Sequence, residues 1–81
     1  MEKFSAVIKT PPVDNTFLGF EGGASYKFNA ELTLGADNNL GVKEIIIMER
    51  PSFLDKIIPG VKCTLYLEYK CNEFIFKEIK F

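Results

Sequence analysis

The stretch Tyr26–Leu34 constrains the fold of this chain more than any other part of its sequence. Its apolar residues take alternate positions: Tyr26, Phe28, Ala30, Leu32 and Leu34. Polar residues fill the positions between them: Lys27, Asn29, Glu31 and Thr33. Because successive side chains of a strand point to opposite faces, the pattern predicts a strand with one buried and one solvated face. A helical period of about 3.6 residues would scatter the same apolar side chains around a cylinder.

Four further segments have the character of strands, and turn residues separate them. They are Phe4–Thr10, Val42–Glu49, Val61–Lys70 and Phe74–Phe81. Residues 13–20 form either a short strand or the continuation of the first strand after Pro11-Pro12. Loops are expected at residues 21–25, 35–41 and 71–73, which are rich in glycine or asparagine.

Alternation also assigns faces to two of these strands. The residues expected to face inward are Phe4, Ala6 and Ile8 in the first strand, and Val61, Cys63, Leu65, Leu67 and Tyr69 in the fourth long one. The run Ile45–Met48 has no alternation. It predicts a strand covered on both faces, either central in a barrel or at a subunit interface.

A short helix is predicted between Pro51 and Pro59. Ser52 and Asp55 have the spacing of a capping box, so a helical turn can begin at Ser52. The apolar residues expected to plug the barrel end are Phe53, Leu54, Ile57 and Ile58. Three strand regions, one helix and a final two-strand hairpin follow the order of the OB-fold, a small β-barrel. An SH3-like barrel has a single strand after its helical turn. We therefore predict an all-β OB barrel of five to six strands as one domain, residues 1–81.

Composition argues against catalysis. The chain has no histidine, and no serine or cysteine lies beside a candidate base in a known motif. Cys63 and Cys71 would lie roughly 25 Å apart on one strand, too far for a disulfide. No cofactor, metal, catalytic residue or small-molecule substrate is expected. No segment has the length of a membrane span or the pattern of a signal peptide, so we expect a cytoplasmic protein.

Nucleic-acid binding has better support than catalysis. The chain carries eight phenylalanines and three tyrosines, and residues 56–81 hold five lysines against three glutamates. Single-strand-binding barrels combine aromatic faces for bases with basic groups for phosphates. Core packing is the alternative for these aromatics: it is favoured for Phe4, Phe28 and Phe53. For Phe20 and Tyr66, core packing and ligand contact are about equally favoured. For Tyr26, which borders a loop, ligand contact is favoured.

Four stretches carry a family resemblance. They are Ile8-Lys9-Thr10-Pro11, Gly23-Ala24-Ser25-Tyr26-Lys27-Phe28, Pro59-Gly60 and Lys77–Phe81. In these stretches the chain resembles the small single-stranded-DNA-binding (helix-destabilising) proteins of filamentous phages. The resemblance implies an OB barrel, a homodimer, and cooperative coating of single-stranded DNA without sequence preference. It also implies a phage or mobile element as the source and a bacterial host cell as the location.

The resemblance assigns roles to four residues. Tyr26 matches a base-stacking aromatic of the binding loop, Phe28 an apolar contact at its base, and Lys43 and Lys80 basic positions that meet phosphates. The family's loop is rich in arginine and lysine, whereas residues 16–24 contain Glu21 and no basic residue. We therefore expect weak binding that depends little on salt.

The predicted nucleic-acid-binding residues come from both arguments. They are Phe20, Tyr26, Lys27, Phe28, Lys43, Tyr66 and Lys80. The formal net charge of −1 favours a competing hypothesis. In that hypothesis the barrel is an accessory, inhibitor or assembly subunit that binds a protein partner through a barrel edge or the Ile45–Met48 strand.

Overall fold

The chain forms a single six-stranded β-sheet with almost no helix, described here from a computed structural model for residues 1–14, 25–48 and 52–81. The elements are β1 (Glu2–Ile8), β2 (Val13–Asp14), β3 (Tyr26–Leu34), β4 (Asn38–Ile47), the 3-10 turn η1 (Leu54–Lys56), β5 (Lys62–Lys70) and β6 (Glu73–Lys80). The expected all-β architecture is thus confirmed. Within the described residues, no helix has the length and apolarity needed to cross a membrane.

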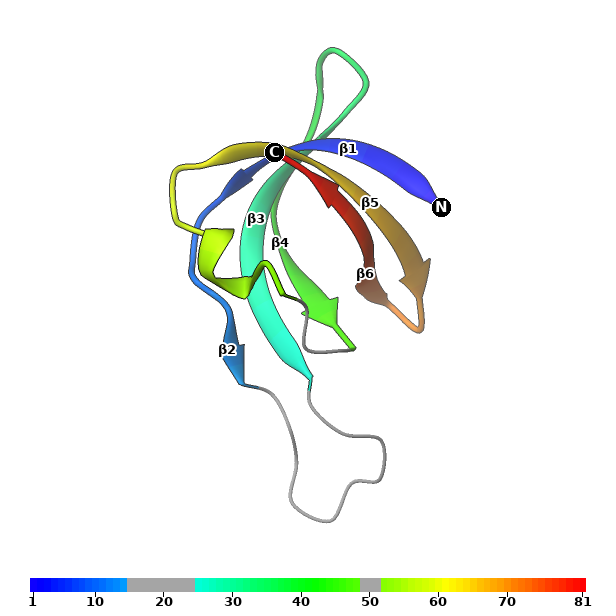
Figure 1. The fold of residues 1–81 in the computed structure, drawn as a ribbon. Coiled ribbons are helices and arrows are strands. Elements are labelled where there is room, and N and C mark those ends of the chain that lie inside the picture. The colour runs from blue at the N-terminus through cyan, green and yellow to red at the C-terminus, as the bar shows by residue number, and fades with distance from the viewer. Residues whose placement is uncertain (15–24, 49–51) are drawn as a thin grey trace.

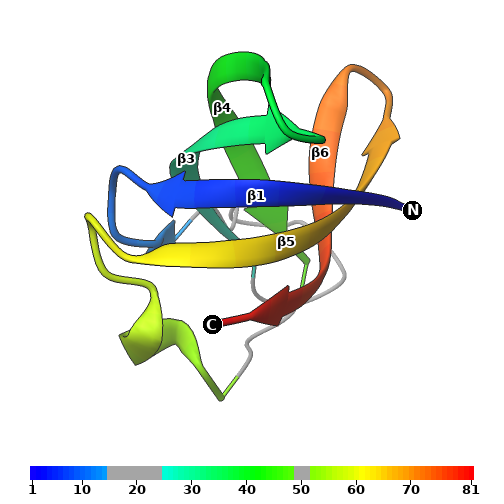
Figure 2. The same ribbon diagram turned by 90° about the horizontal axis from the view of Figure 1, so that it is seen from above.

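The sheet curls back on its own first strand (Figures 1 and 2). Its order is β1-β5-β6-β4-β3-β2, and β1 pairs with β3 as well. The pairings are antiparallel except between β4 and β6, which run parallel over Ile45–Ile46 and Phe74–Ile75. The resulting shape is barrel-like, with one face of every long strand turned toward a shared interior.

The alternating apolar residues of each long strand determine which of its faces points into the interior. Phe4, Ala6 and Ile8 of β1 are buried, as predicted, and so are Phe28, Ala30 and Leu32 of β3. β5 adds Cys63, Leu65 and Leu67, and all of these join one core cluster. The predicted strand Tyr26–Leu34 has the bounds of β3.

The isoleucine run is covered on both faces, as its sequence predicted. Ile45 and Ile47 belong to the core cluster. Ile46, which points to the opposite face of β4, is also buried. Met48, by contrast, is 52% exposed, because β4 ends at Ile47.

The loop between β3 and β4 is shorter than the sequence indicated. Residues Gly35–Asp37 form the turn, and β4 begins at Asn38 rather than Val42. Asn38 and Asn39 pair with Leu34 and Thr33, and the register then shifts by one residue, a β-bulge that a strict alternation does not foresee. Gly41, with a φ of 80°, lies at this irregularity, where other residues would be strained.

The helical segment also differs in detail. The expected capping box does not form: η1 is a 3-10 turn whose N-cap is Phe53, and no side chain caps it. Ile57 is buried, and Phe53 and Leu54 pack against the core, as predicted for a plug. The prediction is wrong for Ile58, which was expected to plug the barrel end but is 53% exposed.

The β5–β6 hairpin closes with a two-residue turn at Cys71 and Asn72, both with positive φ. Such a turn is compatible with the twist of the flanking strands. Tyr69, expected inside, is 60% exposed near this turn. Its ring instead packs edge-on against Phe74, with centroids 4.9 Å apart.

Candidate nucleic-acid interface

Tyr66 and Lys80 are the two predicted site residues that the fold brings into contact. Tyr66 is half-buried on the outer face of β5, and the Nζ of Lys80 lies 5.5 Å from the centre of its ring. A cation at this distance is attracted to the face of the ring. The pair therefore presents an aromatic surface beside a positive charge.

A β-bulge produces this contact. The β5–β6 register shifts between Tyr66 and Leu67, so that Lys77 is the extra residue in β6. Strict alternation from Phe74 and Phe76 would turn Lys80 inward. Because of the bulge, Ile79 packs on the core instead and Lys80 turns outward, diagonal to Tyr66.

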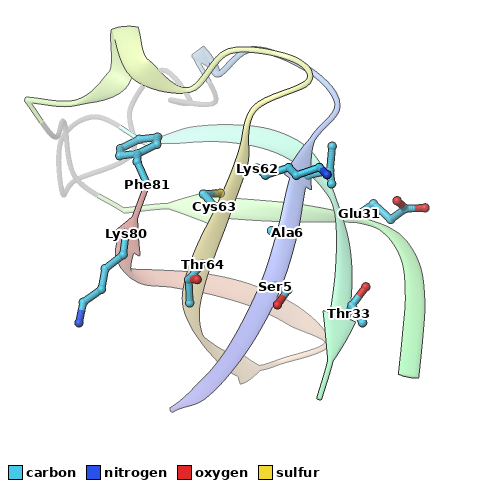
Figure 3. A pocket seen from close by; sticks show the side chains of 10 residues that line it. Ser5, Ala6, Glu31, Thr33, Lys62, Cys63, Thr64, Lys80 and Phe81 are labelled. Atoms are coloured by element: carbon cyan, nitrogen blue, oxygen red, sulfur yellow. The ribbon is translucent and has the colours of Figure 1, made fainter. Parts of the chain in front are cut away.

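Cross-strand register extends this surface into β1 and β3. Lys3 lies opposite Tyr66, and Glu78 lies on the other side of it. In the next row, Thr33, Ser5, Thr64 and Lys80 are successive partners across β3, β1, β5 and β6. The residues of this second row line a shallow depression, shown from close by in Figure 3; the row of Tyr66 lies next to it. We call this the β1–β5 outer face.

Lys62 adds a third positive charge to the β1–β5 outer face. It pairs across β1 with Val7, whose other partner is Glu31. The face thus holds Lys3, Lys62 and Lys80 against Glu31 and Glu78. Glu68, the next outward residue of β5 after Tyr66, forms an ion pair with Lys77 at 3.8 Å, and this pair adds no net charge. The face therefore has a small positive excess on a chain of formal net charge −1.

Lys27 belongs to a different surface. It extends from the outer face of β3, and its Nζ lies 3.9 Å from Glu44 Oε2 on β4. Both side chains are substantially exposed, at 40% and 54%, so the ion pair contributes little to stability. Its charge is nonetheless partly balanced, which weakens its attraction for a phosphate.

Tyr26 and Phe28 point to the interior side of β3. Phe28 is only 2% exposed and lies in the core, so its ring offers no surface to a base. Tyr26 is half-buried against the core and lines a depression with Pro11, Pro12 and Ile58. Neither ring is part of the β1–β5 outer face.

The remaining two residues are also apart from Tyr66. Lys43 is exposed on β4 and borders a separate depression with Tyr69 and Asn72 at the β5–β6 turn. Phe20 lies outside the described residues.

Metal binding and thiol reactivity concern the acidic and cysteine residues of the described part of the chain. No group of three acidic, cysteine or histidine side chains among them could hold a metal ion. Cys63 and Cys71 are free thiols, one buried and one exposed. Burial raises the pKa of the Cys63 thiol, so it is protonated at neutral pH and is a poor nucleophile.

Sequence reasoning missed Lys3, Ser5 and Thr64 as members of one surface with Tyr66. Each is an ordinary outward residue of its own strand. Only the pairing register brings them together, and no local sequence signal encodes it. Comparisons of the chain with family models, with curated proteins and with solved structures find no match.

Proposed function

We propose that this chain is an OB-fold domain. Five long strands, β1, β3, β4, β5 and β6, form the curled sheet together with the two-residue strand β2, and a helical turn lies between β4 and β5. That order and the single parallel pairing support the proposal. Members of this fold class commonly bind oligonucleotides on the face of their second and third strands, which are β3 and β4 here; the site proposed below rests on the side chains of β1, β5 and β6 instead.

Its proposed function is the binding of single-stranded DNA without sequence preference. The observation that carries this function is the half-buried ring of Tyr66 with Lys80 over it and Lys3 in the neighbouring strand. An aromatic platform beside cations can stack any base and attract its phosphate, because every base has a π-face. The site therefore lies on the β1–β5 outer face rather than at Tyr26 and Phe28.

The charge of the chain sets the expected strength. Three lysines on the face give a small electrostatic contribution, and the net charge of −1 opposes approach of a polyanion. Binding should consequently be in the micromolar range at low salt and should rely on stacking.

A titration of fluorescently labelled oligo-dT tests this proposal. Anisotropy should rise with protein concentration at low salt, and Tyr66→Ala should weaken binding by about 1–3 kcal/mol. Tyr69→Ala is the matched control, since it removes an exposed tyrosine that lies outside the site. No change of anisotropy at tens of micromolar protein would refute the proposal.

A protein-binding function is the second candidate, because one edge of the sheet is open. In the described part of the chain, β4 pairs with β6 only at Ile45 and Ile46. The preceding edge, Asn38–Glu44, pairs with β3 alone, and Val42 on it is 54% exposed. An extended segment of a partner could add a strand there. Val42→Lys, which places a charge on this exposed edge, should weaken such binding and spare oligo-dT binding.

The homodimer implied by the family resemblance is also a proposal. Light scattering at high protein concentration should give twice the mass of the chain. A monomer under those conditions would refute the dimer while leaving single-strand binding possible.

A further inference from the structure

Hydroxyl groups form a row across the centre of the β1–β5 outer face. Thr33, Ser5 and Thr64 are cross-strand partners, and Lys80 ends the row on β6. Figure 3 shows Thr33, Ser5 and Thr64 following one another across β3, β1 and β5. Neighbouring strands lie about 4.8 Å apart, so the row from Thr33 to Lys80 covers about 14 Å.

These hydroxyls are available to a ligand. Among the described residues, none of the three side-chain oxygens takes part in a hydrogen bond. Serine and threonine hydroxyls are common donors to phosphate oxygens where proteins hold a nucleic-acid backbone. Stacking on Tyr66 alone would leave that backbone without a partner.

The two ends of this hydroxyl row differ in the charge of the residues around them. On β5, Thr64 lies between Lys62 and Tyr66, and its partner on β6 is Lys80. Near the other end, Glu31 lies on β3 two residues before Thr33. A phosphate is therefore favoured at Thr64 and disfavoured at Thr33.

We propose that Thr64 and Ser5, between Lys62 and Lys80, hold a phosphodiester of the bound single strand while the adjacent base stacks on Tyr66. Residues two apart on a strand face are separated by about 6.6 Å, so a nucleotide can reach from Thr64 to the ring. This inference rests on the proposed function and gives its site a direction: the bound nucleotide runs along β5, from its phosphate at Thr64 to its base on Tyr66.

Two matched substitutions test the phosphate site. Thr64→Val and Thr33→Val each replace a hydroxyl by a methyl group of similar shape, and valine suits a strand. Thr64→Val should weaken oligo-dT binding by about 3- to 10-fold, the loss of one hydrogen bond. Thr33→Val should change it by less than about 2-fold. Because no charge is removed, the salt dependence of binding should stay as in the wild type.

The possible results separate this inference from the function on which it rests. If the wild type binds but Thr64→Val has no effect, or if the two substitutions have equal effects, the phosphate site is overturned. The proposed function would still stand. No binding by the wild type would refute both. If Thr64→Val fails to fold, amide NMR of the wild type with oligo-dT decides. Shifts should concentrate at Ser5, Thr64 and Lys80. Shifts confined to Asn29 and Glu44, which are cross-strand partners on β3 and β4, would overturn the site.

Discussion

The position of Phe28 gives a sharp test of which aromatic residues build the barrel and which bind. The sequence left both roles open, and the structure places the ring in the core, 2% exposed, opposite Ile45. Phe28→Ala should therefore act on folding. Truncation of a buried phenylalanine costs about 3–5 kcal/mol, because apolar contacts are lost and a cavity remains.

That loss is large against the whole stability of the domain. An 81-residue chain at about 0.05–0.15 kcal/mol per residue has a free energy of unfolding of about 4–12 kcal/mol. With a urea m-value of about 1 kcal/mol/M, the unfolding midpoint of Phe28→Ala should fall by about 3–5 M. The variant is then marginally folded or unfolded at room temperature.

Phe28→Leu is the matched control, since leucine fills much of the same space. It should stay folded, with a smaller loss of stability, and should bind oligo-dT as the wild type does. The measurements are urea denaturation followed by circular dichroism and an oligo-dT titration. A Phe28→Ala variant that lost less than about 1 kcal/mol of stability but all DNA binding would refute the assignment of this ring to the core.

Three further predictions concern the free thiols and the hairpin turn. In the native protein a thiol reagent should modify exposed Cys71 at once and Cys63 only on unfolding; simultaneous reaction of both would contradict the burial of Cys63. The folded-state pKa of Cys63 is raised above its ordinary value of 9.0, so its thiol contributes stability that is complete below that pH and is lost as pH rises through the folded-state pKa. A Cys71→Asn, Asn72→Gly double variant should raise the free energy of unfolding by about 1 kcal/mol in urea, because both positions have positive φ; a lower midpoint would refute the turn assignment.

The strands of this fold could be read from the sequence because each long one has a buried face. The bounds of β3 follow directly from its alternation, and the isoleucines of β4 are buried as their continuous run indicated. The local capping signal at Ser52 was less informative than the alternation of the strands. The Ser52 capping spacing did not give a capped helix, since packing of Phe53 and Ile57 shapes that segment.

The candidate site could not be predicted in the same way. Tyr66 and Lys80 were each singled out, but their contact depends on a bulge at Lys77 that reverses the faces of β6. Ser5 and Thr64 meet only through the register of β1 and β5. Such register is set by long-range packing, so a single sequence does not reveal which outward side chains share a surface.

The salt dependence of oligo-dT binding tests the central claim most directly. If a single strand lies on the β1–β5 outer face, it meets Lys3, Lys62 and Lys80. At about 0.7 counterions released per phosphate contact, the logarithm of the binding constant should fall against the logarithm of salt concentration with a slope of about −2. Measured binding at low salt with that slope is the result expected. No binding at about 10 mM salt would contradict the claim that this barrel binds single-stranded DNA.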